Sequence, residues 1–340
     1  MTKLRVAVSP DVVSKEGAPI YDPAVLKLLD HPRIEWSYLT QDVPVVTPEF
    51  AAQYDVLCAM LERVAPASFA RGDHRLRLVS RFGVGYDTID VPSCTANGVM
   101  LNIAPDGVRR PVATSVITFM LVLAQKLLLK DRLTRDGRWA EKTSHMGIGL
   151  TGRTLGLVGV GNIGADVFRL AMPFEMKHIA YDPFAKPETL TGLGVEMVSG
   201  LDEVMRRSDF VSINCPLNVK TRGLIGPSEL GLMKKTAYII NTARGPIIQE
   251  KALYGALRSG AIAGAGLDVF EVEPAPKENP IFKLDNVVVT PHGICYTDEC
   301  FTGIARNTFE AVRALADNVA PKYLVNREVL THEALAGLQR

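Results

Sequence analysis

The sequence predicts an α/β protein in which helices alternate with the strands of parallel sheets. Short runs of β-branched residues recur along the whole chain, and helical patterns lie between them. The intervals between the runs are long enough for crossover connections, which parallel strands require. The chain has 340 residues, of which 47% are hydrophobic, so two domains are expected rather than one.

Four strands are predicted in the first hundred residues, at Leu4 to Val8, Ile34 to Leu39, Val56 to Met60 and Arg77 to Arg81. Intervening segments such as Pro23 to Leu29 are expected to be helical. A long helix is expected to start at Pro111, because proline lacks the N–H that stays unpaired in a first helical turn, and to end at Gly137. This helix would divide the chain into two series of strands.

A second series of strands follows a glycine-rich connection at Gly147, Gly149 and Gly152. The predicted strands are Leu155 to Val158, His178 to Tyr181, Phe210 to Ile213, Ala237 to Asn241, Gly264 to Leu267 and Val287 to Val289. Asp298 to Ala316 is predicted to form another long helix, and Thr331 to Arg340 a short one. Strand and helix therefore alternate through both halves of the chain.

Composition disfavours several classes of function. The 38 Lys+Arg and 37 Asp+Glu residues leave a net charge of +1, without the basic excess typical of nucleic-acid binding. Five cysteines never occur as C-x-x-C, so we expect no metal site and no disulfide framework, and reduced thiols indicate a cytoplasmic protein. The most apolar segment, Val116 to Leu129, is shorter than a membrane span, and the N-terminus lacks a signal-peptide pattern, so no membrane association is expected.

Residues 159–164, Gly-Val-Gly-Asn-Ile-Gly, fit the G-x-G-x-x-G pattern of dinucleotide-binding domains. A buried-type strand precedes them and an amphipathic helix, Ile163 to Ala171, follows. The glycines allow a tight turn, close approach of a pyrophosphate and close helix packing, while the helix N-terminus favours phosphate. The predicted cofactor-binding residues of this motif are Gly159, Gly161, Asn162, Ile163 and Gly164. The alternative is a glycine turn in an α/β domain that binds no ligand.

Asp182 ends the next predicted strand and is the acid that this motif requires. Its carboxylate would accept hydrogen bonds from the adenosine ribose and would repel a 2′-phosphate. No arginine occurs in the following residues, 183–186, that could bind such a phosphate. The sequence therefore predicts NAD in preference to NADP.

Distinctive residues follow several of the predicted strands of the second half. They are Cys215-Pro216, the run Asn241-Thr242-Ala243-Arg244-Gly245, Asp268 with Glu273 close behind, and Pro291-His292. Because the carboxyl ends of parallel strands meet at one edge of a sheet, these groups are expected beside the cofactor. The further cofactor-binding residues predicted here are Cys215, Pro216, Thr221, Thr242, Ala243 and Asp268, with Asp268 accepting from the nicotinamide amide.

Three of these side chains suit hydride transfer to an oxo acid. Arg244 is permanently charged and fork-shaped, which favours binding of a carboxylate or polarisation of a carbonyl. His292 can donate a proton to the oxygen as hydride arrives, since its ordinary pKa is about 6.5. Glu273 would orient the imidazole and raise its pKa. Taken singly, each residue has a simpler interpretation, as a surface charge or a hydrogen-bonded loop histidine.

At these residues the sequence resembles the D-isomer-specific 2-hydroxyacid dehydrogenases, which include phosphoglycerate dehydrogenase and glyoxylate/hydroxypyruvate reductases. The matching stretches are residues 82–90 (FGVGYDTID), 155–164 (LGLVGVGNIG), 241–245 (NTARG), 267–274 (LDVFEVEP) and 290–292 (TPH). They occur in family order and cover most of residues 77–296. Formate dehydrogenases of the superfamily have glutamine in place of Glu273, so that branch does not fit.

The resemblance implies a complete site and architecture. Arg244, Glu273 and His292 would be the catalytic trio, and the backbone of Val84 and Gly85 would bind the substrate together with Arg244 and His292. A flavodoxin-like substrate domain would comprise 1–105 and 297–340, and a Rossmann NAD-binding domain 106–296, with a cleft between them. The expected activity interconverts a 2-oxo acid and a D-2-hydroxy acid. A homodimer with the helix after Pro111 at its interface is also implied.

Two alternatives stay open at this point: an NAD-sensing scaffold similar to corepressors of this family, and an NAD-dependent phosphite-type dehydrogenase.

The chain also departs from the family pattern, with Thr114 in place of the glutamate of V-A-E and with 293–296 (GICY) after the histidine. The pair Arg109-Arg110 before the long helix is either a solvated basic pair or a contact for a second anionic part of the substrate.

Overall fold

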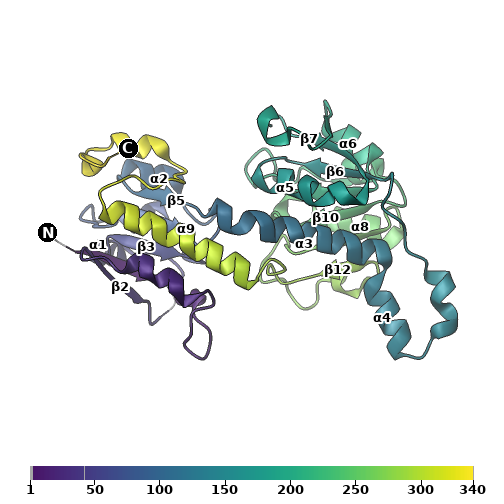
Figure 1. The fold of residues 1–340 in the computed structure, drawn as a ribbon, viewed down its shortest axis with the longest axis horizontal. Coiled ribbons are helices and arrows are strands. Elements are labelled where there is room, and N and C mark those ends of the chain that lie inside the picture. The colour runs from purple at the N-terminus through teal and green to yellow at the C-terminus, as the bar shows by residue number, and fades with distance from the viewer. Residues whose placement is uncertain (1–2, 42, 340) are drawn as a thin grey trace. The chain divides into compact units, whose positions relative to one another are not determined.

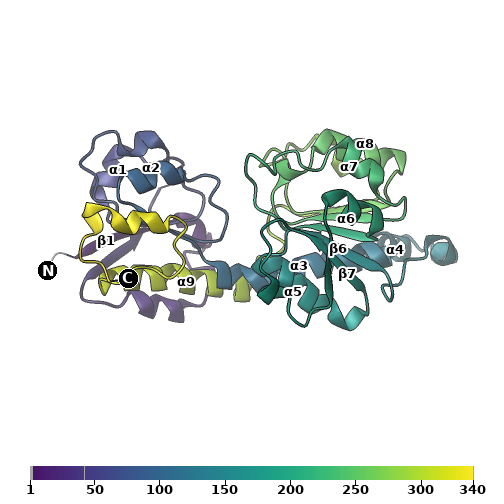
Figure 2. The same ribbon diagram turned by 90° about the horizontal axis from the view of Figure 1, so that it is seen from above.

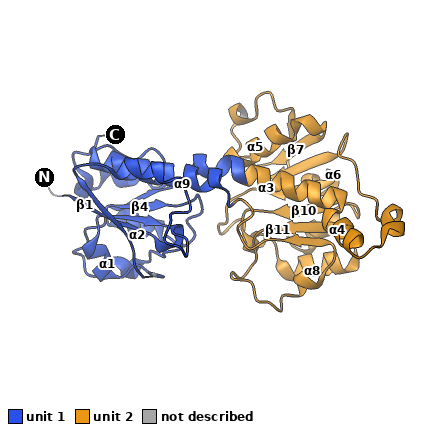
Figure 3. Ribbon diagram, turned by 60° about the horizontal axis from the view of Figure 1, so that its bottom comes forward, with its two compact units in different colours: residues 1–111, 296–340 blue, residues 112–295 orange. Residues whose placement is uncertain are grey.

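Two parallel sheets organise the chain, which a computed structural model describes for residues 3–41 and 43–339. The chain forms two compact units, each held together by its own internal contacts (Figure 3). Unit 1 takes in Met1–Pro111 and Tyr296–Arg340, and unit 2 takes in Val112–Cys295. The predicted fold class, two parallel-sheet α/β domains, is confirmed.

The sheet of unit 1 has five parallel strands in the order β2-β1-β3-β4-β5. They are β1 (Leu4–Val8), β2 (Ile34–Tyr38), β3 (Val56–Ala59), β4 (Leu78–Arg81) and β5 (Met100–Asn102). This is the flavodoxin-like order. The strands all run parallel, but the order in which the chain adds them to the sheet reverses between β1 and β3. The sequence does not predict β5, because Met-Leu-Asn contains no β-branched residue.

Short helices and one long helix cover this sheet: the 3-10 helix η2 (Pro23–Leu29), α1 (Pro48–Gln53), α2 (Val91–Ala96) and α9 (Asp298–Ala316). Helix α9 has the predicted bounds and packs against η2, β3 and β4 (Figures 1 and 2). Phe309 of α9 lies 5.7 Å, ring centre to ring centre, from both Tyr21 and Phe82. Helix α9, from the C-terminal part of the chain, thus packs in the same core as residues from the first hundred.

Unit 2 contains seven parallel strands in the order β12-β11-β10-β9-β6-β7-β8. They are β6 (Thr154–Val158), β7 (Lys177–Tyr181), β8 (Val195–Met197), β9 (Phe210–Ile213), β10 (Tyr238–Asn241), β11 (Gly264–Leu267) and β12 (Val287–Val289). Only the three-residue β8 lacks a counterpart among the predicted strands. The strand order reverses between β6 and β9, which is where open α/β sheets bind ligands.

Two hydrophobic cores lie in unit 2. Helices α3 (Pro105–Gln125) and α5 (Asn162–Ala171) contribute to one, which includes Phe119 and Phe168. Helices α6 (Leu201–Arg207), α7 (Pro227–Leu232) and α8 (Glu250–Ser259) contribute to the other, which includes Val204 and Leu253. A Cβ atom at Gly266 of β11 would lie 2.8 Å from the Phe119 ring, so the glycine allows α3 to approach the sheet.

The long helix does not start at Pro111 as the sequence predicts. Helix α3 begins at Pro105, and Pro111 lies inside it. The cause is tertiary packing, because a Cβ atom at Gly107 would lie 2.3 Å from the Ile304 backbone nitrogen, so the first turn is held closely against α9. Lys126, with φ 51°, separates α3 from α4 (Leu127–Arg135), and Gly137 follows with φ 71°.

The C-terminal segment and the most apolar helix are the last two parts of the fold. The end of the chain forms 3-10 turns at Arg327–Thr331 and Glu333–Leu335 instead of a helix over 331–340, and Gly337, with φ 89°, stops further helical turns. Arg340 lies outside the described residues. Among the residues described, α3 alone is long and apolar enough to cross a membrane, and 61% of its most apolar window is buried within the protein, as in a core helix.

Candidate active site

The glycine turn after β6 has the geometry that a dinucleotide requires. Gly159 has φ 95°, and a Cβ atom there would lie 2.6 Å from the backbone nitrogen of Cys215 at the end of β9. A Cβ atom at Gly164 would lie 2.6 Å from the Gly159 carbonyl oxygen, whereas one at Gly161 would meet no atom within 4 Å. The turn is therefore packed on its protein side and open at its middle glycine.

Helix α5 starts directly from this turn. Gly161 is its N-cap and offers no side-chain oxygen to the N–H groups of the first turn, which leaves them for a phosphate. Asp182 is bound to the same turn, since its carboxylate accepts the N–H of Val160 at 2.9 Å and the N–H of Phe184 at 2.8 Å. The hydroxyl oxygen of Thr242, buried after β10, has no partner among the described residues. These groups fit a bound dinucleotide.

The loop after β9 contains Cys215, Pro216 and Thr221. The Thr221 hydroxyl donates to the Pro216 carbonyl at 2.6 Å and accepts the Asn218 N–H at 2.8 Å, so this side chain also closes its own loop. Burial raises the pKa of the Cys215 thiol to about 11, so the thiol stays protonated at neutral pH. The backbone nitrogen of Cys215 lies beside the glycine turn and limits the space at Gly159.

Arg244 is held by the loop that follows β10. The Asn241 side chain is buried and bridges the loop, accepting the Ala243 N–H and donating to the Arg244 carbonyl, both at 3.0 Å. The Arg244 guanidinium donates to the Ala243 carbonyl at 2.7 Å. A Cβ atom at Gly245 would lie 1.9 Å from the Phe270 carbonyl carbon, so only glycine lets this loop approach the loop that carries Glu273.

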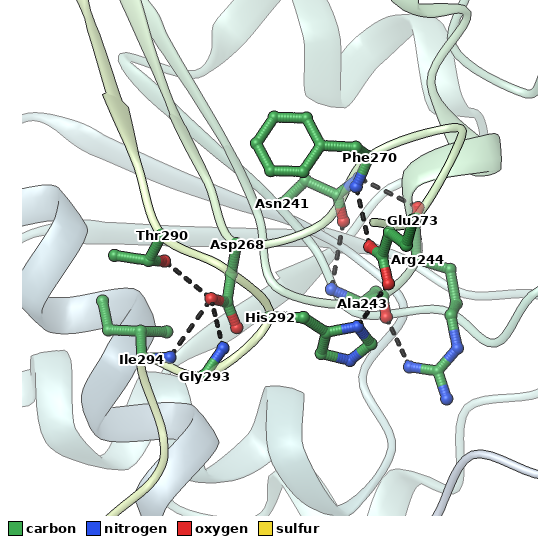
Figure 4. Close-up of polar contacts among 10 residues, drawn as sticks. All are labelled: Asn241, Ala243, Arg244, Asp268, Phe270, Glu273, Thr290, His292, Gly293 and Ile294. Atoms are coloured by element: carbon green, nitrogen blue, oxygen red, sulfur yellow. Dashed lines mark hydrogen bonds and ion pairs between the residues drawn. The ribbon is translucent and has the colours of Figure 1, made fainter. Parts of the chain in front are cut away.

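His292 and Glu273 form a hydrogen-bonded pair (Figure 4). The distance from His292 Nδ1 to Glu273 Oε2 is 2.7 Å, and the second carboxylate oxygen accepts the Phe270 N–H at 2.9 Å. The carboxylate is thus fixed from both sides, and with Nδ1 as the donor the other ring nitrogen, Nε2, is left for a reacting group.

Asp268 organises the loop that carries His292. Its buried Oδ1 accepts from the Thr290 hydroxyl at 2.6 Å and from the N–H groups of Gly293 and Ile294 at 2.9 and 3.1 Å (Figure 4). Its carbonyl oxygen accepts the His292 N–H at 2.8 Å. His292 has φ 52°, an uncommon conformation for a residue other than glycine, which these contacts hold in place.

The sequence predicts no role of their own for Asn241 and Thr290. Both stand at the carboxyl ends of strands, β10 and β12, and that position was the available signal. The sequence predicts a contact of Asp268 with the cofactor, which stays a prediction; the structure shows that its carboxylate holds the His292 loop.

Residues 117–293, more than half of the chain, match the family described as "D-isomer specific 2-hydroxyacid dehydrogenase, NAD binding domain". The chain belongs to the D-isomer-specific 2-hydroxyacid dehydrogenases. The matched range lies within α3 and unit 2, where the glycine turn and the His292–Glu273 pair are found.

Individual members of the family are similar to this chain in sequence and in structure. A glyoxylate reductase of Korarchaeum cryptofilum is 38% identical over 81% of this chain and 84% of its own length. A D-3-phosphoglycerate dehydrogenase of Methanocaldococcus jannaschii is 39% identical over 78% of this chain, which spans half of that protein. The structure of D-lactate dehydrogenase from Aquifex aeolicus with NAD and lactic acid superposes with a TM-score of 0.80 at 27% identity, covering 92% of this chain and 95% of that one.

Electrostatics at the site of this dehydrogenase favour a protonated His292. The hydrogen bond to Glu273 is the main cause of a raised His292 pKa; burial and the positive charge of Arg244 act in the opposite direction. Partial burial by itself would raise the pKa of Glu273, but hydrogen bonds from His292 and the Phe270 N–H, with the nearby positive charges, hold it below its ordinary value. The pair is therefore stabilised as imidazolium and carboxylate.

The remaining predicted residues, Val84 and Gly85, lie in unit 1, in the loop after β4. Their N–H groups donate to no other group in residues 3–41 and 43–339. Within the same described ranges, no three His, Cys, Asp or Glu side chains are grouped so as to hold a metal ion.

Proposed function

We propose that this dehydrogenase interconverts a 2-oxo acid and a D-2-hydroxy acid, with His292 as the acid/base, Glu273 as its orienting partner and Arg244 as the substrate-binding cation. The observation that carries the proposal is the 2.7 Å hydrogen bond between His292 and Glu273, which leaves Nε2 for the substrate oxygen. A protein that only sensed NAD would have no need of a proton donor held in this way, so the pair favours an enzyme over a scaffold.

The residues divide the work of carbonyl reduction. Bound NAD would supply the hydride in its reduced form and accept it in the reverse direction. Protonated His292 gives its Nε2 proton to the carbonyl oxygen, so that the product alcohol carries one new C–H and one new O–H bond, and neutral His292 regains a proton from solvent. Glu273 stabilises the imidazolium throughout. Arg244 binds the substrate carboxylate and keeps the carbonyl carbon in position for the hydride.

NAD would be held by residues of the glycine turn and the neighbouring strand ends. Gly159, Gly161, Asn162, Ile163 and Gly164 face the phosphates, and Asp182 accepts from the adenosine ribose and disfavours a 2′-phosphate. The other residues of this proposed site are Cys215, Pro216, Thr221, Thr242, Ala243 and Asp268. The backbone of Val84 and Gly85 is the further substrate-binding group of the proposal.

The direct test is consumption of NADH in the presence of glyoxylate, hydroxypyruvate, pyruvate, phenylpyruvate or 2-oxoglutarate. We expect turnover of at least one of these and a clear preference for NADH over NADPH, because of Asp182. A folded protein that binds NADH but turns over none of the panel would refute the proposal. Oxidation of phosphite with NAD in that case would favour the phosphite-type alternative.

Glu273→Gln is expected to lower kcat for reduction by roughly tenfold to a hundredfold, the effect of losing one charged hydrogen bond. Glu273 raises the pKa of His292, so its removal lowers that pKa. Reduction needs protonated His292, and its rate falls as pH rises through this pKa; the fall should therefore occur at lower pH in the variant. Oxidation needs neutral His292, so its activity should extend to lower pH. Profiles of kcat against pH in both directions measure the shifts.

Glu278→Gln is the matched control, because Glu278 is an exposed carboxylate outside the pair. Its profiles should coincide with those of the wild type. An unchanged profile in Glu273→Gln would remove Glu273 from the mechanism.

We further propose that the enzyme is a homodimer. Four large apolar side chains are exposed in the segment from α4 to residue 150: Leu127, Leu128, Trp139 and Met146. Burying them against a second copy would remove them from water. Light scattering should give twice the chain mass, and Trp139→Glu should shift it toward a single chain. Val219→Glu, at an exposed apolar residue elsewhere in unit 2, should leave the mass unchanged; a wild-type monomer would contradict the proposal.

A further inference from the structure

The loop after β4 presents three consecutive N–H groups, those of Val84, Gly85 and Tyr86, that donate to no other group in the described ranges 3–41 and 43–339. The loop stands at the carboxyl end of a strand in an open parallel sheet, where ligands bind. Successive backbone N–H groups in a turn can form a concave site for an anion. They can therefore serve both oxygens of one carboxylate.

The peptides on either side of Gly85 are fixed through their carbonyl groups. The Gly83 carbonyl accepts the Ala104 N–H at 2.9 Å, and the Gly85 carbonyl accepts Arg81 Nε–H at 2.8 Å. In a trans peptide the N–H points opposite to the carbonyl. The Val84 N–H therefore points away from Ala104, and the Tyr86 N–H points away from Arg81.

Arg81 is itself held firmly. Its guanidinium also donates to the Met60 carbonyl at the end of β3, and its own carbonyl accepts the Thr308 hydroxyl of α9 at 3.1 Å. The Met60 N–H in turn donates to the buried Glu62 carboxylate at 2.7 Å. The Arg81 side chain thus connects the loop to Met60, just after β3. Met60 is held at its carbonyl by Arg81 and at its N–H by Glu62.

We propose that Arg81 is a positioning residue for the substrate carboxylate. Resting on the function proposed above, this assigns to Arg81 the task of holding the Gly85–Tyr86 peptide so that three N–H groups converge on one carboxylate. Its guanidinium donates to the backbone carbonyls of Gly85 and Met60, and through the first of these it acts on the loop. Its loss lets this peptide rotate, and the substrate must then restore the arrangement on binding.

Arg81→Met tests this, because methionine keeps much of the aliphatic stem and removes the donors. KM for the best 2-oxo acid is expected to rise roughly tenfold to a hundredfold, the range for one charged hydrogen bond, with kcat little changed. The inhibition constant of oxamate, an unreactive mimic of a 2-oxo acid, should rise by the same factor. The dissociation constant of NADH, measured by fluorescence, should stay the same because the proposed NAD residues are in unit 2.

Two further variants separate positioning from stability. Arg81→Lys keeps a charged donor but lacks the two separate nitrogens with which Arg81 reaches the Gly85 and Met60 carbonyls, so it should recover part of the lost affinity. Arg5→Met removes an exposed arginine of β1 and should leave KM, the oxamate constant and NADH binding as in the wild type. Thermal unfolding of each variant reports whether it is folded, and Arg81→Lys serves as the test if Arg81→Met is not.

Unchanged KM and oxamate constants in folded Arg81 variants would overturn the inference and leave the proposed function intact. A loss of NADH affinity equal to the loss of oxamate affinity would also overturn it, since that indicates a general structural defect. A wild-type enzyme without activity on any 2-oxo acid would overturn both.

Discussion

His292→Asn is expected to lower kcat by roughly 10²- to 10⁴-fold, the contribution of general acid–base catalysis. Asparagine cannot donate a proton with a pKa near neutrality, so the hydride would have to reach a carbonyl whose oxygen gains no proton. Asparagine is also among the few residues that adopt the left-handed conformation readily, and position 292 has φ 52°. The substitution therefore removes the acid while keeping the backbone of the loop.

Single-turnover and steady-state kinetics measure this loss, with NADH affinity measured alongside. His145→Asn, at a histidine outside the Glu273 pair, should retain wild-type kcat. His292→Ala should lose the same activity. Near-normal turnover of His292→Asn would rule out His292 as the acid/base.

Arg244→Gln should lower kcat/KM by roughly 10²- to 10⁴-fold, since a guanidinium can make two charged hydrogen bonds to a carboxylate. A second effect concerns pH. The positive charge of Arg244 lowers the pKa of His292, so its removal raises that pKa, and the loss of reductase activity at high pH should occur at higher pH. This shift is opposite in sign to that of Glu273→Gln.

Arg244→Lys keeps the positive charge but not the fork-shaped donor. Its pH profile should therefore stay close to that of the wild type, while its kcat/KM should fall. Arg258→Gln, at an exposed arginine of α8, is the control for loss of one charge from unit 2. If both site substitutions moved the pH profile in the same direction, the assigned electrostatic roles of Arg244 and Glu273 would be wrong.

Much of unit 2 could be predicted from the sequence because its signals are local. A buried strand, a glycine turn and an amphipathic helix occupy neighbouring residues, so β6, Gly159 and α5 follow from hydrophobic pattern and turn chemistry alone. The same holds for Arg244 and His292, whose places after strands could be read without the fold. Strands β5 (Met-Leu-Asn) and β8 (Val-Glu-Met) lack a run of β-branched residues, whereas β12, equally short, is Val-Val-Val and is predicted.

The start of α3 shows where local signals fail. Pro111 has the properties of a first helical residue, yet the helix begins at Pro105 because Gly107 packs on the α9 backbone at Ile304. Those two segments are almost two hundred residues apart in the sequence, so no local pattern reports their contact.

The sequence by itself determined the class of the protein: parallel α/β domains, a dinucleotide turn, and an arginine, a glutamate and a histidine after successive strands. Only the tertiary structure decided how these groups are held. Asp268 fixes the left-handed His292 loop, Asn241 fixes the Arg244 loop, and Arg81 connects the Gly85 loop to β3. Each is a hydrogen bond of a single side chain to a turn, without periodicity, and its geometry exists only once the strands have brought the turns together.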